Sequence, residues 1–315
     1  MAAAARVNPK DFFSPEQWAK LSARSSWCGL ALVAHCWLMI GAAMAMGALW
    51  PVTIPLAVVL IGNRQLGLFI LMHDAAHALL HRNRAINDWV GKWLCGTDLA
   101  AYRPYHLQHH RFVQQSEDPD LILSAPFPIT RGSLRRKMIR DLTGQTFFKQ
   151  RFGRLMDKLK SRQAGESAWR ILAAEARLQR LFLIQNAIGL ALFSLAGLGW
   201  AWCLLWLLPM ATWLPLISRL RNISEHALVA QNGNDPLRHA RTTHANWIER
   251  LLIAPYWVNY HCEHHMFTQI ACWNLPAAHR ILKRQGATAR MELQPGYLTL
   301  LRAASAAPTP AARAA

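Results

Sequence analysis

Two long stretches of the chain contain no Asp, Glu, Lys or Arg. They run from Trp27 to Gly62 and from Leu181 to Ser218. A bilayer core of ~30 Å needs about 20 apolar residues in a helix, so each stretch is long enough for two passes. Pro51 and Gly199 lie near the middles of the two stretches, where turns are expected. The pattern predicts four membrane-spanning helices in two hairpins, at about residues 27–47, 51–72, 181–199 and 201–218.

This pattern indicates an all-α integral membrane protein. The alternative is a soluble protein with long buried helices, but such helices normally show a polar face, which neither stretch has. About 26 polar and basic residues precede the first stretch, so we expect residues 1–26 to be a cytoplasmic N-terminal segment and not a signal peptide. Residues 27–305 are expected to form the membrane domain. The Ala-rich residues 306–315 are expected to form a mobile tail.

The distribution of charge predicts the topology. The chain carries 35 Lys and Arg against 17 Asp and Glu, a net charge of +18. Residues 82–180 hold 19 of the basic residues and 9 of the acidic ones, whereas the turns near Pro51 and Gly199 hold none. Positive residues stay on the cytoplasmic side of a membrane. We therefore expect the cytoplasmic side to hold residues 73–180, residues 219–305 and both termini, and the two outer turns to be uncharged. We therefore expect a bacterial inner-membrane protein with a cytoplasmic helical cap.

Composition excludes several other classes. A hydrophobic content of 53% excludes a disordered chain. The six cysteines contain no C-x-x-C pair, so neither a disulfide scaffold nor an iron–sulfur cluster is expected. Nucleic-acid binding through the basic middle of the chain predicts steeply salt-dependent affinity, but topology and anionic lipid headgroups already account for the charge. We expect no nucleic-acid partner.

Histidines are gathered in three short motifs. The second and third motifs share the pattern H-x-x-H-H, and the first has two histidines four residues apart; the members are His73 and His77, His106, His109 and His110, and His261, His264 and His265. Residues three and four apart share a helix face, and imidazole is a strong ligand for iron, zinc and copper. A two-pass hairpin separates the second motif from the third, so all three are expected on the cytoplasmic side.

A fourth candidate motif follows the last predicted pass, where Asn222 and His226 are four residues apart. With His226 the set holds nine imidazoles, which are too many for one metal ion and suit two. The other histidines weighed, His35, His81, His239 and His279, are expected to be surface or hydrogen-bonded residues, with a smaller prospect of a ligand role for His81.

Carboxylates near the motifs are candidate partners of the ligands. A ligating imidazole usually donates its other ring N–H to a carboxylate or carbonyl. Asp74, Asp118, Glu225 and Glu263 are the candidates, with Asp120 beside them; the alternative for each is a charge on a helix surface. Arg64 interrupts the second predicted pass, and a charge at membrane depth is expected to face a protein or aqueous interior.

Three segments resemble the histidine boxes of the membrane-bound fatty acid desaturase and hydroxylase family of di-iron enzymes. They are Arg64 to Asp88, His106 to Leu121 and Arg241 to His265, and the whole resemblance runs from about Arg64 to Leu282. It implies that the nine histidines bind two iron ions and that Asn222 reaches one of them through water. Phe267 to Ala271 lack the prolines that the family commonly has there.

The resemblance also implies the chemistry. We expect O2 as co-substrate, no heme or flavin in this chain, and electrons from a separate carrier of the ferredoxin, rubredoxin or cytochrome b5 type. The favoured reaction is desaturation of an acyl chain on a lipid, CoA or carrier protein. Hydroxylation or ketolation of a lipid or small amphiphile is the alternative on the same scaffold. A membrane protein that binds or transports a transition metal is the alternative from another class.

Overall fold

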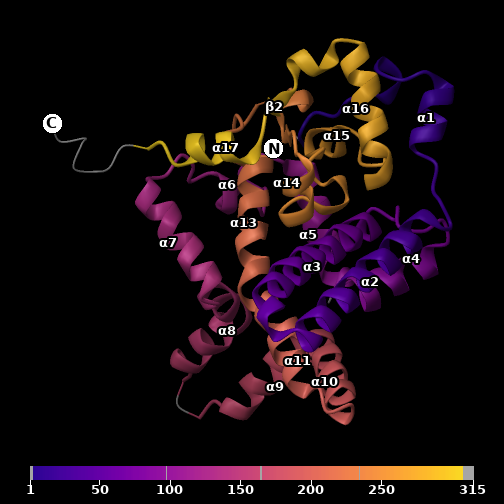
Figure 1. The fold of residues 1–315 in the computed structure, drawn as a ribbon. Coiled ribbons are helices and arrows are strands. Elements are labelled where there is room, and N and C mark those ends of the chain that lie inside the picture. Colours follow the sequence, from indigo (N-terminus) through magenta and orange to yellow (C-terminus); the bar gives the residue numbers. More distant parts are fainter. Residues whose placement is uncertain (1–2, 97, 164, 234, 308–315) are drawn as a thin grey trace. The chain divides into compact units, whose positions relative to one another are not determined.

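The computed structural model describes residues 3–96, 98–163, 165–233 and 235–307, and the described chain is mostly helical (Figure 1). The helices are α1 (Pro15–Leu21), α2 (Cys28–Leu49), α3 (Ile54–Ala76), α4 (Arg84–Val90), α5 (Leu99–Phe112), α6 (Leu121–Ser124), α7 (Arg131–Leu142), α8 (Gln145–Lys160), α9 (Ala168–Leu178), α10 (Arg180–Leu195), α11 (Gly199–Trp202), α12 (Leu208–Ala211), α13 (Trp213–His226), α14 (Trp247–Leu252), α15 (His261–Met266), α16 (Leu275–Arg284) and α17 (Tyr297–Ala304). Most of the predicted tail, from residue 308 on, lies outside the described residues.

The chain divides into two compact units. The first comprises Met1–Leu38, Leu66–Arg135 and Ile217–Ala315, and the second comprises Met39–Gln65 and Arg136–Leu216. All three histidine motifs and His226 belong to the first unit.

Among the described residues, three helical segments are long and apolar enough to cross a membrane: Cys28–Leu49, Pro51–Ala76 and Gly199–His226. Helices α9 and α10 meet at a bend of 78°, and they add a fourth span if the bent pair is counted as one. This differs from the straight pass expected at 181–199. At ~1.5 Å per residue, the 16 residues of α10 reach only about 24 Å, short of the ~30 Å core.

Close approaches inside each unit depend on glycine. In the first unit, a Cβ on Gly29 of α2 would lie 2.0 Å from the carbonyl oxygen of Leu80. In the second, a Cβ on Gly189 of α10 would lie 2.1 Å from the ring of Trp202.

As expected for a charge at membrane depth, Arg64 is buried, and its Nε donates to Oδ1 of Asn63 over 3.0 Å.

Two short strands depart from the all-helical expectation. β1 (Arg241–Thr243) pairs in parallel with β2 (Glu292–Gln294), and Thr242 also forms an antiparallel bridge to Tyr260. The β-branched Thr242 and Thr243 suit an extended backbone. The bridge ties β1 to the residue that precedes α15, so the strand pair fixes the start of the helix that carries the third histidine motif.

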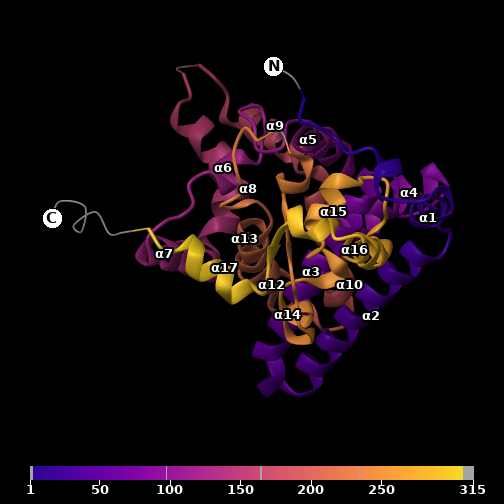
Figure 2. The same ribbon diagram turned by 90° about the horizontal axis from the view of Figure 1, so that it is seen from above.

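The N-terminal segment packs against the end of the same motif. The ring of Phe267, which follows α15 and is fully buried, lies 4.9 Å from the ring of Phe13 and 6.1 Å from that of Trp18 on α1. Helix α16 lies beside both α1 and α15, and Figure 2 shows α15 and α16 next to each other from above. Aromatic packing therefore holds the loop after the third motif in place.

Candidate metal centre

The nine candidate imidazoles form two groups. The ligand atoms within each group lie within 4.8 Å of one another. The first cluster consists of His73, His77, His106, His110 and His264, and the second cluster consists of His109, His226, His261 and His265. Seven of the rings are buried and two, His77 and His265, are half-buried.

Helices α5 and α15 each contribute to both clusters. On α5, His106 and His110 are one turn apart and join the first cluster, while His109 points to the second. On α15 the assignment is reversed, because His261 and His265 join the second cluster and His264 the first. The repeated H-x-x-H-H spacing thus places an i,i+4 pair on one site and the intervening histidine on the other.

Burial favours the neutral form of six of these imidazoles. It lowers the pKa of His77 to about 3, with a further contribution from the charges of His109 and Arg103. Burial likewise lowers the pKa of His106, His110, His261, His264 and His265 well below the ordinary value. Neutral imidazoles keep a lone pair on one ring nitrogen, which is the form that binds metal ions.

The contacts between these rings fit a metal ion. Nε2 of His110 faces Nε2 of His106 and Nε2 of His264, each at 3.0 Å. In the second cluster, Nε2 of His261 faces Nε2 of His226 at 2.9 Å and Nε2 of His265 at 3.1 Å. A neutral ring nitrogen carries either one proton or one lone pair and cannot bond two such neighbours. A cation at the centre of each group satisfies all of them.

An unpartnered nitrogen in the first cluster supports the same reading. Nε2 of His73 is buried and has no hydrogen-bond partner in the described part of the chain. An orphaned buried nitrogen costs free energy, and coordination to a metal removes that cost. The donor set of imidazole nitrogens suits iron, copper or zinc.

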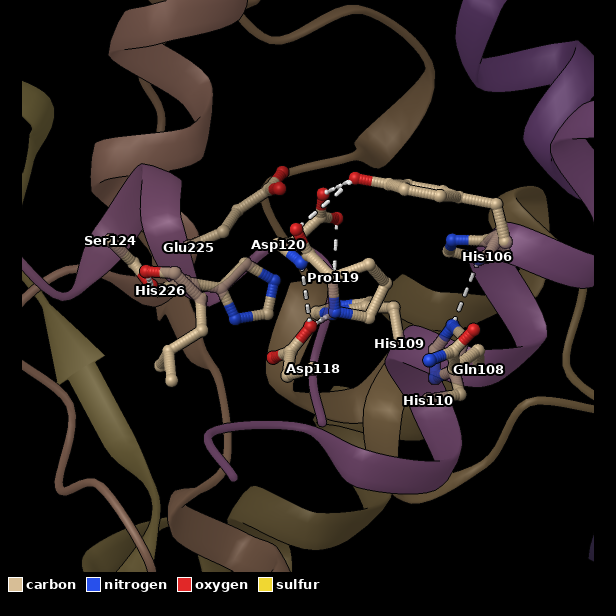
Figure 3. Close-up of polar contacts among 12 residues, drawn as sticks. His106, Gln108, His109, His110, Asp118, Pro119, Asp120, Ser124, Glu225 and His226 are labelled. Atoms are coloured by element: carbon tan, nitrogen blue, oxygen red, sulfur yellow. Dashed lines mark hydrogen bonds and ion pairs between the residues drawn. The ribbon is translucent and has the colours of Figure 1, made fainter. Parts of the chain in front are cut away.

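Carboxylates lie beside the outer nitrogens of two of the rings. Nδ1 of His109 donates to Oδ1 of Asp118 over 2.7 Å, which leaves Nε2 for a metal (Figure 3). Asp118 is itself held by the backbone N–H groups of Gln114 and Asp120, each at 2.9 Å. In the first cluster, Oδ1 of Asp74 lies 3.5 Å from Nδ1 of His73. Both aspartates thus face the outer nitrogen of an imidazole, as a supporting carboxylate does.

The two glutamates lie differently. Glu263, although it is in the third motif, bonds Thr242 and Nδ1 of His279 and no clustered ring, because its side chain leaves α15 on the side of β1 and α16. Glu225 pairs with Arg221, and its Oε2 lies 3.4 Å from Nε2 of His261, the nitrogen that faces the second cluster. Neither glutamate supports an outer ring nitrogen.

The other histidines considered from the sequence, His35, His81, His239 and His279, lie outside both clusters. Nδ1 of His35 lies 3.0 Å from the hydroxyl of Tyr256, His81 accepts from the backbone N–H of Asn83, and Nε2 of His239 lies 3.1 Å from the carbonyl oxygen of Gly233. Asn222 is half-buried on α13, one turn before His226.

Sequence reasoning missed several residues that position the ligands. The Arg103 guanidinium donates to the carbonyl oxygens of Ala75 and Ala76, each at 3.0 Å, and so caps the end of α3 between His73 and His77. Tyr102 stacks on His106 with ring centroids 5.2 Å apart. Its place four residues before His106 was the available signal, since such residues share a helix face.

A buried arginine holds the second cluster in a similar way. Nη1 of Arg241 donates to the carbonyl oxygen of Ala227 over 2.7 Å, just beyond His226. Nε2 of Gln114 donates to the carbonyl oxygen of His226 itself over 3.0 Å. Both contacts fix the end of α13, and neither has a local sequence signal.

A cavity of about 440 Å³ opens beside the first cluster. His77 lines it together with Trp18, Leu107, Arg24 and Gln269. The cavity gives a route from solvent to the first cluster, and none of its lining residues belongs to the second cluster.

The clustered histidines lie within a stretch of the chain that is similar to known proteins. Residues 48–296 match the family model described as Fatty acid desaturase, a range that includes all nine clustered histidines. The chain is also similar to dihydrorhizobitoxine desaturase of Bradyrhizobium elkanii, with 27% identity over 258 residues that cover 77% of this chain and 69% of that protein.

Proposed function

The chain belongs to the fatty acid desaturase family, and on that basis we propose that it is a membrane di-iron oxidoreductase that uses O2 to desaturate an acyl chain. The observation that carries this proposal is the separation of nine imidazoles into two clusters of five and four. Two clusters suit two ions, and nitrogen donors suit iron.

The bound iron pair would supply the oxidising power that, with O2 and external electrons, removes hydrogen from an unactivated C–H bond. The chain's own residues hold and orient that pair. Asp118 fixes the ring of His109 through its outer N–H, and Arg103 fixes the end of α3 beside His73 and His77. Burial lowers the pKa of His77, His106, His110, His261, His264 and His265 and so keeps these six rings unprotonated. We further propose that Asn222, one turn before His226, reaches a metal ion through water.

The proposed topology has four passes, and the third begins where α9 ends and bends by 78° into α10. It places residues 1–26, 73–180 and 219–305, and therefore both clusters, on the cytoplasmic side of a bacterial inner membrane. The absence of charge from the two predicted outer turns supports this orientation. On the cytoplasmic side a ferredoxin, rubredoxin or cytochrome b5 type of carrier can deliver electrons.

The proposed substrate is an acyl chain on a lipid, CoA or carrier protein. The similar protein from Bradyrhizobium elkanii is named for dihydrorhizobitoxine, so a small amphiphile is included among the candidates. Hydroxylation or ketolation on the same scaffold is the second candidate reaction, because the ligand set is compatible with each. Metal transport is disfavoured, since a transport path places polar ligands along the passes, whereas these imidazoles gather in two closed groups.

The test is product analysis with a matched inactive variant. Cells that contain the wild-type protein and a suitable reductant are compared with cells that contain His264→Ala, by lipid and metabolite mass spectrometry. We expect a product two hydrogens lighter than its precursor in the wild type alone. A product one oxygen heavier would instead establish hydroxylation, and identical profiles together with metal-free protein would contradict the proposal.

A further inference from the structure

Helices α8 and α9 of the second unit expose a row of apolar side chains. Phe148, Phe152 and Met156 follow one another every four residues along α8 and are 57%, 40% and 49% exposed. Trp169 and Leu172, three residues apart on α9, are 76% and 38% exposed. Residues three and four apart share a helix face, so each helix presents one apolar side to its surroundings. Exposed apolar faces of this kind mark an interaction surface.

The two helices are tied to each other through polar groups. The buried carboxylate of Glu175 on α9 accepts from Nε of Arg154 over 2.9 Å and lies 3.0 Å from Nζ of Lys158, both on α8. Nε2 of Gln179 donates to the carbonyl oxygen of Arg151 over 2.8 Å. Helices α8 and α9 therefore pack beside each other as one element (Figure 1).

The direction of α9 relative to the next helix indicates how it meets a membrane. Helices α9 and α10 are adjacent in the sequence, and they meet at a bend of 78°. Helix α10 carries no charge after Arg180 and is the third pass of the proposed topology. A helix bent by 78° from a pass that follows the membrane normal lies nearly parallel to the membrane surface. Helix α9 also holds Arg170, Glu175 and Arg177, which are costly at membrane depth, so it suits the interface and not the apolar core.

Basic side chains border the apolar face of α8. Lys149 lies seven residues before Met156 and Lys160 lies four residues after it, so both share its side of the helix. Neither ammonium group has a hydrogen-bond or ion-pair partner in the part of the chain that the structure describes. Residues 145–178 hold eight Lys and Arg against three Asp and Glu. An apolar face bordered by cations is typical of a helix that lies in a leaflet with anionic lipids.

We propose that α8 and α9 lie in the plane of the cytoplasmic leaflet, with their apolar faces in the acyl region and with Lys149 and Lys160 on the phosphate groups of anionic phospholipids. A leaflet is favoured over an acidic protein as the partner, because the adjoining pass already brings this surface to the headgroups. The inference rests on the membrane placement in the proposed function and on none of its metal chemistry. By holding the start of α10 at the interface, the pair sets the depth at which the third pass enters the bilayer.

Fluorescence in nanodiscs tests this placement. The full-length protein, with the exposed cysteines changed by Cys28→Ser and Cys203→Ser, carries a nitrobenzoxadiazole label on Phe152→Cys or on Gln150→Cys. Positions 150 and 152 lie on opposite sides of α8, so the exposed position 150 is the matched control. We expect nitroxide-labelled phospholipids to quench the label at 152, and water-soluble dithionite to reduce the label at 150.

Two results would overturn the placement. Equal reduction by dithionite at positions 150 and 152 would show that the apolar face of α8 lies in water. A label at 152 that neither reagent reaches would show that a protein, either a partner or a second copy of this chain, covers that face.

Lipid charge is tested with the same label at position 152. At equal content, nitroxide-labelled phosphatidylglycerol should be enriched there over nitroxide-labelled phosphatidylcholine by about fivefold per lysine, the effect of one cation near an anionic surface. Lys149→Gln with Lys160→Gln should remove this preference. Lys20→Gln with Lys283→Gln, which removes the same charge from exposed positions of the first unit, should keep it. A preference that survives the first pair of substitutions would contradict phosphate binding by these lysines.

These readings depend on neither iron nor turnover. A protein that does not stay in the nanodisc would contradict the membrane placement in the proposed function. Absence of a desaturated product, with both labels behaving as expected, would contradict the proposed reaction and leave this inference standing.

Discussion

The two clusters share helices α5 and α15 but have different surroundings. The first, which contains His77, borders a cavity and receives support from Asp74 and from Arg103 at the end of α3. The second is flanked by Asp118 on an outer nitrogen and by Glu225 on an inner one. If both clusters bind metal as proposed, the first ion would lie beside this cavity and the second beside two buried carboxylates.

Loss of one imidazole from each cluster should have the largest effect. His264→Ala removes a ligand from the first cluster and His109→Ala one from the second. We expect each variant to lose more than ~100-fold in affinity for one ion only, by comparison with the smaller effect of outer partners, and to form no product. Metal content and product are measured together on membrane-inserted protein. Full activity in either variant would remove that histidine from the ligand set.

Loss of the supporting carboxylates should be weaker and selective. Asp118→Asn is expected to weaken the second ion by ~10–100-fold, and Asp74→Asn to weaken the first, because each outer carboxylate orients one ring. Metal affinity of both sites is measured in both variants. If the two substitutions affected the same ion, the division into two clusters would be wrong.

A pH titration tests how the lowered pKa of a buried imidazole affects the stability of the folded protein. Burial lowers the pKa of His77 to about 3, whereas an unfolded histidine titrates near ~6.5. Between these values the unfolded chain binds protons that the folded chain does not, so the metal-free protein should lose stability as the pH falls below ~6.5. Thermal unfolding in detergent at pH 7.5, 6.5 and 5.5 measures this. A melting temperature that is flat over this range would show that the rings are accessible to protons.

The smallest effect is expected outside the clusters. His35→Ala removes a hydrogen bond to Tyr256, which is worth about 1 kcal/mol of unfolding free energy. Iron content should be unchanged, and denaturant unfolding should show only the small loss of stability. A lost iron in this variant would mean that α2 contributes to the centre, and the comparison of the two clusters would have to be redrawn.

Much of the centre was predictable because helical periodicity is local. Residues three and four apart share a face wherever the helix lies, so the nine imidazoles that form the two clusters could be chosen from spacing and charge-free stretches alone. The sorting of His106 and His110 to one cluster and His109 to the other depends on which rings α5 and α15 present to each other, and spacing does not encode that choice.

The glutamates show the limit most clearly. Glu225 and Glu263 are each adjacent to a ligand in sequence, and the prediction treated them alike. Glu263 leaves its helix toward Thr242 and His279, whereas Glu225 is directed by Arg221 toward His261. Tertiary neighbours decide these directions. For the same reason the 78° bend between α9 and α10 and the pairing of β1 with β2 had no local signal.

The central claim is that two imidazole clusters each hold one iron. Anomalous scattering from the protein, measured on both sides of the iron absorption edge, tests it most directly. The account predicts two iron peaks, one surrounded by His73, His77, His106, His110 and His264 and the other by His109, His226, His261 and His265. A single peak shared by all nine rings, or zinc in place of iron at both positions, would contradict it.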